Sequence, residues 1–92
     1  IEDVPLMLGL IEDENNVLNF NKPSGRLVQV YAFGPLKEKE IINYYNLVLP
    51  EFGWKNIHDL VFVREGEILK INLFRENSTL IVVFMLSPDT TE

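Results

Sequence analysis

The residues best suited to acid–base or nucleophilic chemistry are one histidine and a few serines. His58 is followed directly by Asp59. Neighbouring residues of a strand point to opposite faces, so this pair would not form the hydrogen bond that orients a catalytic histidine. Ser24, Ser78 and Ser87 fall in predicted turns or in the tail, and the absence of cysteine excludes thiol catalysis, disulfides and thiolate metal sites. We therefore predict a protein that is not an enzyme and has no catalytic residues.

Oxygen donors for a metal are densest in the run Glu12-Asp13-Glu14-Asn15-Asn16. A calcium loop of the EF-hand type needs acids at alternate positions, a central glycine and a distal glutamate. This run lacks the glycine and the spacing. No acid lies within an apolar predicted strand, where burial would raise its pKa toward that of a general acid. The run predicts a solvated acidic turn, and we expect no metal and no cofactor.

The formal net charge of −6 is concentrated near the start of the chain, because residues 1–14 contain five of the fourteen acids and no base. The rest is almost neutral and has no basic stripe that could replace the counterions of a nucleic acid. No apolar run approaches the roughly 20 residues that span a bilayer. The sequence therefore predicts no nucleic-acid binding and no membrane insertion of the mature chain.

The elements that would position these residues begin with one clear helix, predicted over residues 36–53. Apolar residues recur at spacings of three, one, three, one and three, which is the period of a single helix face. Pro50 removes a backbone hydrogen bond late in the helix, and Gly53 fits a left-handed helix stop. The face consists of Ile41, Tyr44, Tyr45, Val48, Leu49 and Phe52.

Strand-like sequence flanks this helix on both sides. β-Branched and aromatic runs separated by turn residues predict strands at 17–20, 26–33, 60–64, 68–74 and 79–86, with 54–57 the least regular. Residues 1–92 are predicted to form a single α+β domain, an antiparallel sheet of four or five strands wrapped on a single helix in the order ββαβββ. An acidic and apolar arm, 1–14, precedes the sheet, and a polar tail, 87–92, follows it.

The last strand is apolar on both faces, which a sheet covered by one helix does not require. Something is expected to cover the second face, either the N-terminal segment PLMLGL or a protein partner or second subunit. The predicted interaction surface comprises Leu6, Met7, Leu8, Leu80, Val82 and Phe84.

An alternative is a small apolar ligand held in a pocket between helix and sheet. Core packing is the simpler interpretation of these aromatic residues, because 92 residues leave little volume once a core is filled. The predicted pocket is lined by Tyr31, Tyr45, Trp54 and Phe62.

Four motifs, PLMLGL, PSGRLV, YY-x₃-LPEFGW and VREGEIL, lie between residues 5 and 69, within a match that extends to about Leu86. Their pattern resembles a family of small uncharacterised exported α-proteobacterial proteins with PLMPGL, P-x-GRI, FY-x₃-LPQLGW and REGE-x-L. Leu8 stands where that pattern has proline. The resemblance implies a periplasmic protein whose export signal has been removed, in keeping with a chain that starts at Ile1, and it transfers no catalytic residues. The helix end is also similar, at the level of fold, to helix-grip modules of bacterial envelope lipoproteins. The function we expect is a non-enzymatic bacterial envelope interaction module.

Overall fold

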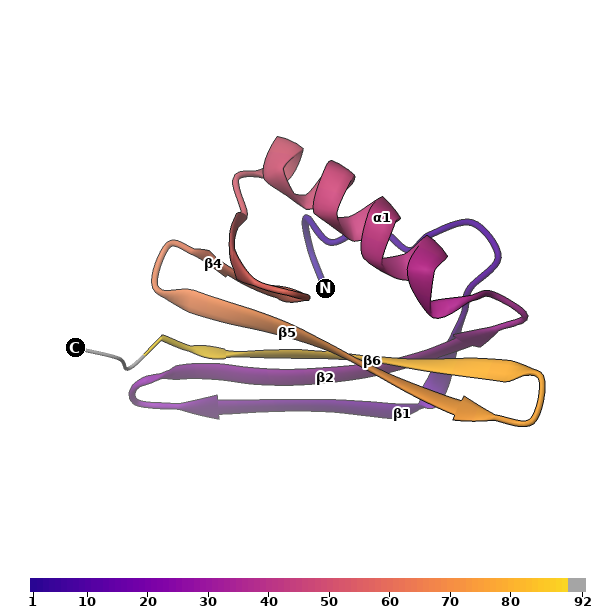
Figure 1. The fold of residues 1–92 in the computed structure, drawn as a ribbon. Coiled ribbons are helices and arrows are strands. Elements are labelled where there is room, and N and C mark those ends of the chain that lie inside the picture. Colours follow the sequence, from indigo (N-terminus) through magenta and orange to yellow (C-terminus); the bar gives the residue numbers. More distant parts are fainter. Residues whose placement is uncertain (90–92) are drawn as a thin grey trace.

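The chain folds into one antiparallel sheet with a single α-helix across one of its faces, and the computed structural model describes residues 1–89 (Figure 1). Two strands precede the helix and four follow it. In chain order the elements are β1 (Ile11–Lys22), β2 (Gly25–Gly34), α1 (Glu38–Val48), the 3-10 turn η1 (Leu49–Phe52), β3 (Lys55–His58), β4 (Val61–Arg64), β5 (Glu67–Glu76) and β6 (Thr79–Pro88).

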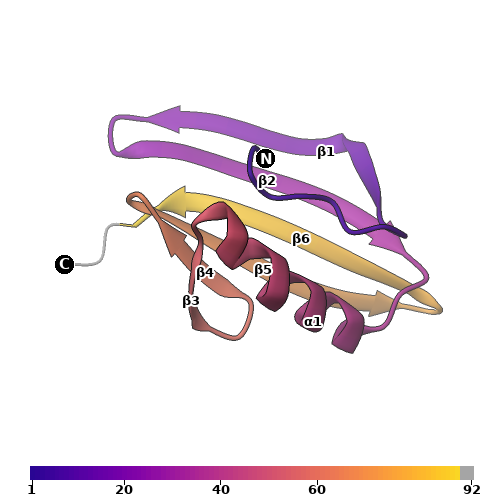
Figure 2. The ribbon, with the colours of Figure 1, turned by 90° about the horizontal axis from the view of Figure 1, so that it is seen from above.

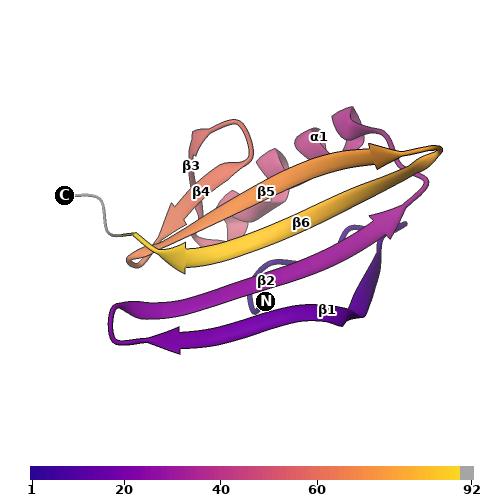
Figure 3. The ribbon, with the colours of Figure 1, turned by 90° about the horizontal axis from the view of Figure 1, so that it is seen from below.

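The six strands are arranged in the order β1-β2-β6-β5-β4-β3, and every neighbouring pair is antiparallel. The last strand, β6, therefore lies inside the sheet between the long strands β2 and β5 (Figures 2 and 3). The edges of the sheet are β1 and β3. An interior position gives β6 backbone partners on both edges, and its helix-side residues Leu80, Val82 and Phe84 are buried in the core, whereas Met85 on the opposite side is 38% exposed.

Helix α1 lies on the sheet through a single apolar stripe. Its buried residues Ile41 and Tyr45, together with Leu49 in η1, are each fully buried and follow one another at intervals of four. The Glu40 carboxylate accepts the backbone N–H of Lys37 at 3.0 Å and so closes the first turn. Pro50 tightens the last turn into a 3-10 helix, and Gly53 ends it with a φ of 87°.

The core fills the space between α1 and the facing side of the sheet. The Tyr45 ring contacts Phe84 edge to face, with ring centroids 5.4 Å apart. Its buried strand residues include Val30, Ala32, Phe62, Leu69, Ile71, Leu80, Val82, Phe84 and Leu86. These side chains alternate along their strands, so the opposite side of the sheet carries the residues between them.

The N-terminal arm, residues 1–10, lies on the same side of the sheet as the helix (Figure 2). The Tyr45 hydroxyl accepts the N–H of Met7 at 3.1 Å and donates to the carbonyl of Pro5 at 2.8 Å. The Trp54 indole N–H donates to the carbonyl of Asp3 at 3.1 Å. Two buried polar groups on the helix side need partners, and the arm's backbone supplies them. The expectation that PLMLGL covers the second face is therefore wrong.

The predicted fold of four or five strands in the order ββαβββ is also wrong, because the structure has six strands in the order ββαββββ. The additional strand is the segment after Trp54, which pairs with β4 as β3. The acidic run predicted as a turn begins β1 instead, and β6 extends to Pro88, into the predicted polar tail. The regular α-helix covers only Glu38–Val48 of the predicted 36–53.

Candidate functional site: the open face of the sheet

The side of the sheet away from α1 and the arm carries no other element of the described chain (Figure 3). The strand register places the side chains of this side in rows that cross the sheet. One row joins Phe33 on β2 to Ile81 on β6 and Phe74 on β5. A parallel row joins Leu18 on β1 to Gln29 on β2 and Met85 on β6. We call this side the open face and define it by Leu18, Phe20, Leu27, Tyr31, Phe33, Phe74, Ile81, Val83 and Met85.

Large apolar side chains of the open face are in contact with solvent. Phe74 and Leu18 are each 56% exposed, Phe33 is 39% exposed and Met85 is 38% exposed. Val83, at the centre, is only 3% exposed because its neighbours cover it. Contiguous exposed apolar residues on a sheet mark an interaction surface more often than scattered ones do. The open face is therefore the strongest candidate for a functional site.

A groove of about 650 Å³ lies at one end of the open face. Its apolar floor includes Tyr31, Phe33 and Ile81, and residues 76–79 of the β5–β6 turn form one wall. Asp13 and Asn16 form the opposite wall, where the β1 register shifts. The Asp13 carboxylate accepts the side-chain amide of Asn16 at 2.6 Å and thereby fixes this bulge. Two residues of the acidic run, Asp13 and Asn16, are thus part of the groove's lining.

A smaller hollow of about 190 Å³ lies farther along the open face. Leu18, Leu27 and Met85 contribute its apolar lining, and Lys70 stands at its border. The nearby Asn72 amide lies 3.1 Å from the Met85 sulfur. The open face therefore has an apolar centre with polar and charged side chains around it, as the interfaces of non-obligate complexes do.

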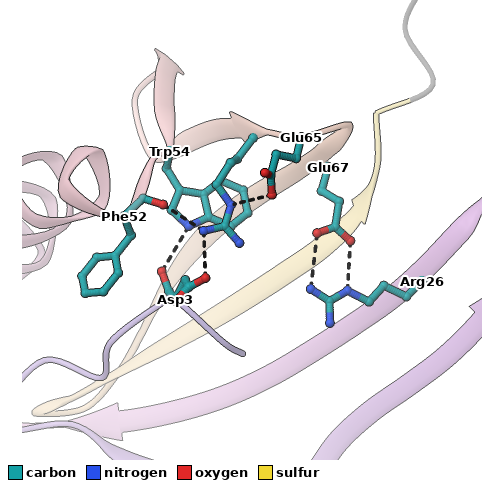
Figure 4. A network of polar contacts seen from close by, with 7 residues as sticks. Asp3, Arg26, Phe52, Trp54, Glu65 and Glu67 are labelled. Atoms are coloured by element: carbon teal, nitrogen blue, oxygen red, sulfur yellow. Dashed lines mark hydrogen bonds and ion pairs between the residues drawn. The ribbon is translucent and has the colours of Figure 1, made fainter.

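The main polar network lies on the helix side of the molecule (Figure 4). The Arg64 guanidinium stacks over the Trp54 ring at 4.5 Å and donates to the Phe52 carbonyl at 2.8 Å and to the Asp3 carboxylate at 3.0 Å. These contacts join the arm, the end of the helix and β4. A second pair, Arg26 with Glu67, joins β2 to β5, and the carboxylate raises the pKa of the Arg26 guanidinium. The Arg64 contacts and the Arg26–Glu67 pair therefore both connect separate parts of the fold.

The Tyr45 hydroxyl is a buried titratable group that bonds to the N-terminal arm. Burial raises the pKa of Tyr45 to about 12, and the Met7 N–H opposes this shift only in part. The Tyr45 hydroxyl is therefore a structural hydrogen-bonding group at neutral pH. His58 lies in the exposed edge strand β3, where its carbonyl accepts the Asn56 amide at 2.7 Å. Among residues 1–89, no group of three or more His, Cys, Asp or Glu side chains is placed to hold a metal ion.

The predicted interaction surface does not form one surface. Leu80, Val82 and Phe84 lie in the core beneath the helix, at 0%, 0% and 3% exposure. Leu6 and Leu8 are exposed on the arm, whereas Met7 packs against the core. The error has a physical cause: both faces of the last strand are apolar, and a period of two does not say which of them the helix covers.

The predicted helix–sheet pocket does not form either. Tyr45, Trp54 and Phe62 are at most 2% exposed and belong to the core. Tyr31 lies on the other side of the sheet, where its hydroxyl accepts the Gln29 amide at 3.0 Å. The sheet itself therefore separates Tyr31 from the other three aromatic rings.

No family model matches this chain. No curated protein and no solved structure matches it either. The resemblance to exported α-proteobacterial proteins therefore stays a prediction. Within the described residues, none of the helical segments has both the length and the apolarity needed to cross a membrane.

Sequence reasoning missed the residues that define the open face. The predicted surface uses Leu80, Val82 and Phe84 of the last strand, whereas the open face carries the alternate set Ile81, Val83 and Met85. Phe33 and Phe74 are a sequence signal that could have shown which face of the last strand is exposed. Both pair with Ile81 in the observed register, so the three side chains lie in one row across β2, β6 and β5.

Proposed function

We propose that this protein is a non-enzymatic interaction module that binds a protein partner through the open face of its sheet. The observation that carries this proposal is the row formed by Phe33, Ile81 and Phe74 across three strands. Two of its members are 39% and 56% exposed, whereas Tyr45, Trp54, Phe62 and Phe84 are buried in the core. A partner that covers the row removes apolar surface from water, which is favourable by about 25 cal/mol for each Å².

The chemistry of the open face favours a protein over a charged polymer as its partner. Interface centres are enriched in aromatic residues and methionine and depleted in charge, and the open face supplies Phe33, Phe74 and Met85. The charged groups Asp13 and Glu76 line the larger groove, and Lys70 lines the smaller hollow. The family resemblance adds a location to this proposal, the bacterial periplasm.

The proposal is tested by capture of a partner from bacterial envelope extract, followed by titration of the purified partner. Phe74→Lys places a charge in the row and is expected to weaken binding by at least tenfold, as at an interface hot spot. Leu47→Lys is the matched control, because Leu47 is 74% exposed on the helix, on the other side of the molecule. Equal weakening by both substitutions, or none by Phe74→Lys, would refute the proposal.

A second candidate function, binding of a small apolar molecule, is favoured by the groove of about 650 Å³. Phe33 and Ile81 would contact the apolar part of such a ligand. The neutral dye Nile red is a suitable probe, and saturable binding at one site that Phe33→Lys abolishes would support this function. Weak binding without saturation would count against it and in favour of a protein partner.

A further inference from the structure

Strand β1 is an edge strand in which residues 17–21 have none of the usual protection against pairing with another strand. Residues 17–21, VLNFN, contain no charge and no proline, and Val17, Leu18 and Phe20 are 46%, 56% and 51% exposed. The other edge, β3, has only four residues and begins with Lys55. Natural sheets block their edges with short strands, charges or prolines. The edge at β3 is blocked in this way, whereas residues 17–21 are open.

We propose that a second copy of this chain pairs with β1 about a two-fold axis, so that two six-stranded sheets join into one. A two-fold contact uses the same surface on both copies, so the two β1 strands must run antiparallel. Alternate residues of an edge strand turn their N–H and C=O groups away from the sheet, and a second copy would satisfy them. The occupant of this edge is therefore another molecule of the same protein.

The register follows from the part of β1 that is regular. Its ladder with β2 is continuous from Val17 to Lys22 and shifts between Asp13 and Val17. A two-fold axis at Asn19 pairs residues 17–21 of the two copies with each other, within this regular part. Leu18 then lies directly opposite Phe20 of the second copy, and Phe20 lies opposite Leu18.

Both of these side chains belong to the open face, because Leu18 pairs with Gln29 and Phe20 pairs with Leu27. The pairing would therefore cover two half-exposed apolar side chains on each copy. Directly opposite apolar residues are the favourable cross-strand pairs of an antiparallel sheet. The contact between Leu18 and Phe20 of the two copies thus favours the same register as the regular part of the β1 ladder.

Charge complementarity favours the same antiparallel arrangement. The first half of β1 carries Glu12, Asp13 and Glu14 without a base, and the second half ends in Lys22. With the axis at Asn19, Lys22 of one copy lies opposite Asn16 of the other and next to its acidic run. Opposite charges on neighbouring strands attract, whereas a parallel arrangement would place acid beside acid.

The proposed pairing uses the β1 edge of the sheet, whereas the proposed function uses the open face. In the paired dimer, the open faces of the two copies would form one continuous apolar surface. Self-association through β1 and partner binding through the open face can each be refuted without the other. Self-association is measured on the pure chain, whereas binding through the open face is measured with a purified partner.

Sedimentation equilibrium of variants that carry charges at positions 18 and 20 tests the pairing. Wild type is expected to form a concentration-dependent dimer. A variant with Leu18→Lys and Phe20→Lys, and another with Leu18→Glu and Phe20→Glu, are each expected to dimerise at least about tenfold more weakly, because like charges lie opposite each other. An equal mixture of the two variants is expected to regain the dimer. A wild type that stays monomeric at every concentration, or a mixture that does not dimerise, would overturn the proposal.

The matched control carries Phe74→Lys and Met85→Lys, which lie on the same face but on β5 and β6. This variant should dimerise as wild type does; if it alone lost the dimer, the sheets would be stacked face to face and the edge proposal would be wrong. Hydrogen exchange of wild type decides the matter without any substitution. Amides within residues 17–21 should exchange more slowly as concentration rises, and exchange independent of concentration would contradict the pairing.

Discussion

The substitution Tyr45→Phe isolates the contact that holds the N-terminal arm on the helix side of the sheet. The Tyr45 ring is fully buried, and its hydroxyl bonds to both Met7 N–H and the Pro5 carbonyl. Phenylalanine keeps the ring and its edge-to-face contact with Phe84 but removes the only polar atom of the side chain. The two arm groups then lose their partner.

Each unsatisfied, partly buried backbone group costs about 1 kcal/mol or more, since hydrogen bonds contribute about 0.5–1.5 kcal/mol each. We therefore expect Tyr45→Phe to lower the free energy of unfolding by about 2 kcal/mol. Urea unfolding followed by Trp54 fluorescence is the assay. The Trp54 indole N–H donates to Asp3 of the same arm, so its emission also reports release of the arm.

The loss of folding stability at alkaline pH gives an independent check on the role of Tyr45. The pKa of Tyr45 is raised to about 12 in the folded chain by burial, whereas an unfolded tyrosine titrates near 10. The folded state therefore holds its proton more tightly, so the stabilisation is complete below about pH 10 and is lost as pH rises through the folded pKa. The loss reaches roughly 2 kcal/mol at pH 12, and Tyr45→Phe should remove this part of the alkaline loss.

Tyr44→Phe is the matched control, because Tyr44 is adjacent on the same helix and only half-buried. It should change the free energy of unfolding by less than about 0.5 kcal/mol. Two results would refute the reasoning. One is an equal loss of stability in both variants. The other is a Tyr45→Phe variant that loses as much stability at alkaline pH as wild type does.

The remaining predictions concern other contacts. Gly34→Ala should destabilise the fold by about 2–3 kcal/mol in urea unfolding, because the added Cβ would overlap the carbonyl of Gly9. Gly66→Ala meets no neighbouring atom and should cost only about 1 kcal/mol from its positive φ. Glu38→Gln should reduce the loss of stability as pH falls below about 4.5, because its ion pair lowers the pKa of the folded carboxylate. Arg64→Met should shift the Trp54 emission and lower the melting temperature, since the guanidinium covers that ring.

The existence of most elements could be predicted because their periods are local properties of the sequence. The stripe through Ile41, Tyr45 and Leu49 is a helix pattern wherever it occurs, and Pro50 and Gly53 mark its end. The turns at Pro23-Ser24 and Glu65-Gly66 are equally local. These signals placed the helix and the strands β2, β4, β5 and β6 close to where they lie, whereas β1 begins six residues before its predicted start at Val17.

The strand order and the choice of face could not be predicted in the same way. Both depend on β6 pairing with β2 and β5, which are contacts between distant parts of the chain. The position of the arm depends on the hydrogen-bonding needs of Tyr45 and Trp54, and these appear only once both side chains are buried. The same is true of the groove at Asp13, because it requires the β1 bulge to lie beside the β5–β6 turn.

The most direct test of the open face as an interaction surface is photo-crosslinking with benzoylphenylalanine placed at Phe74 and, separately, at Leu47. Both side chains are more than half exposed, but only Phe74 lies on the open face. With envelope extract, we expect a discrete adduct from Phe74 that excess unlabelled wild type suppresses, and no such adduct from Leu47. Equal adducts from both positions, or none from Phe74, would contradict the assignment of the open face as the binding surface.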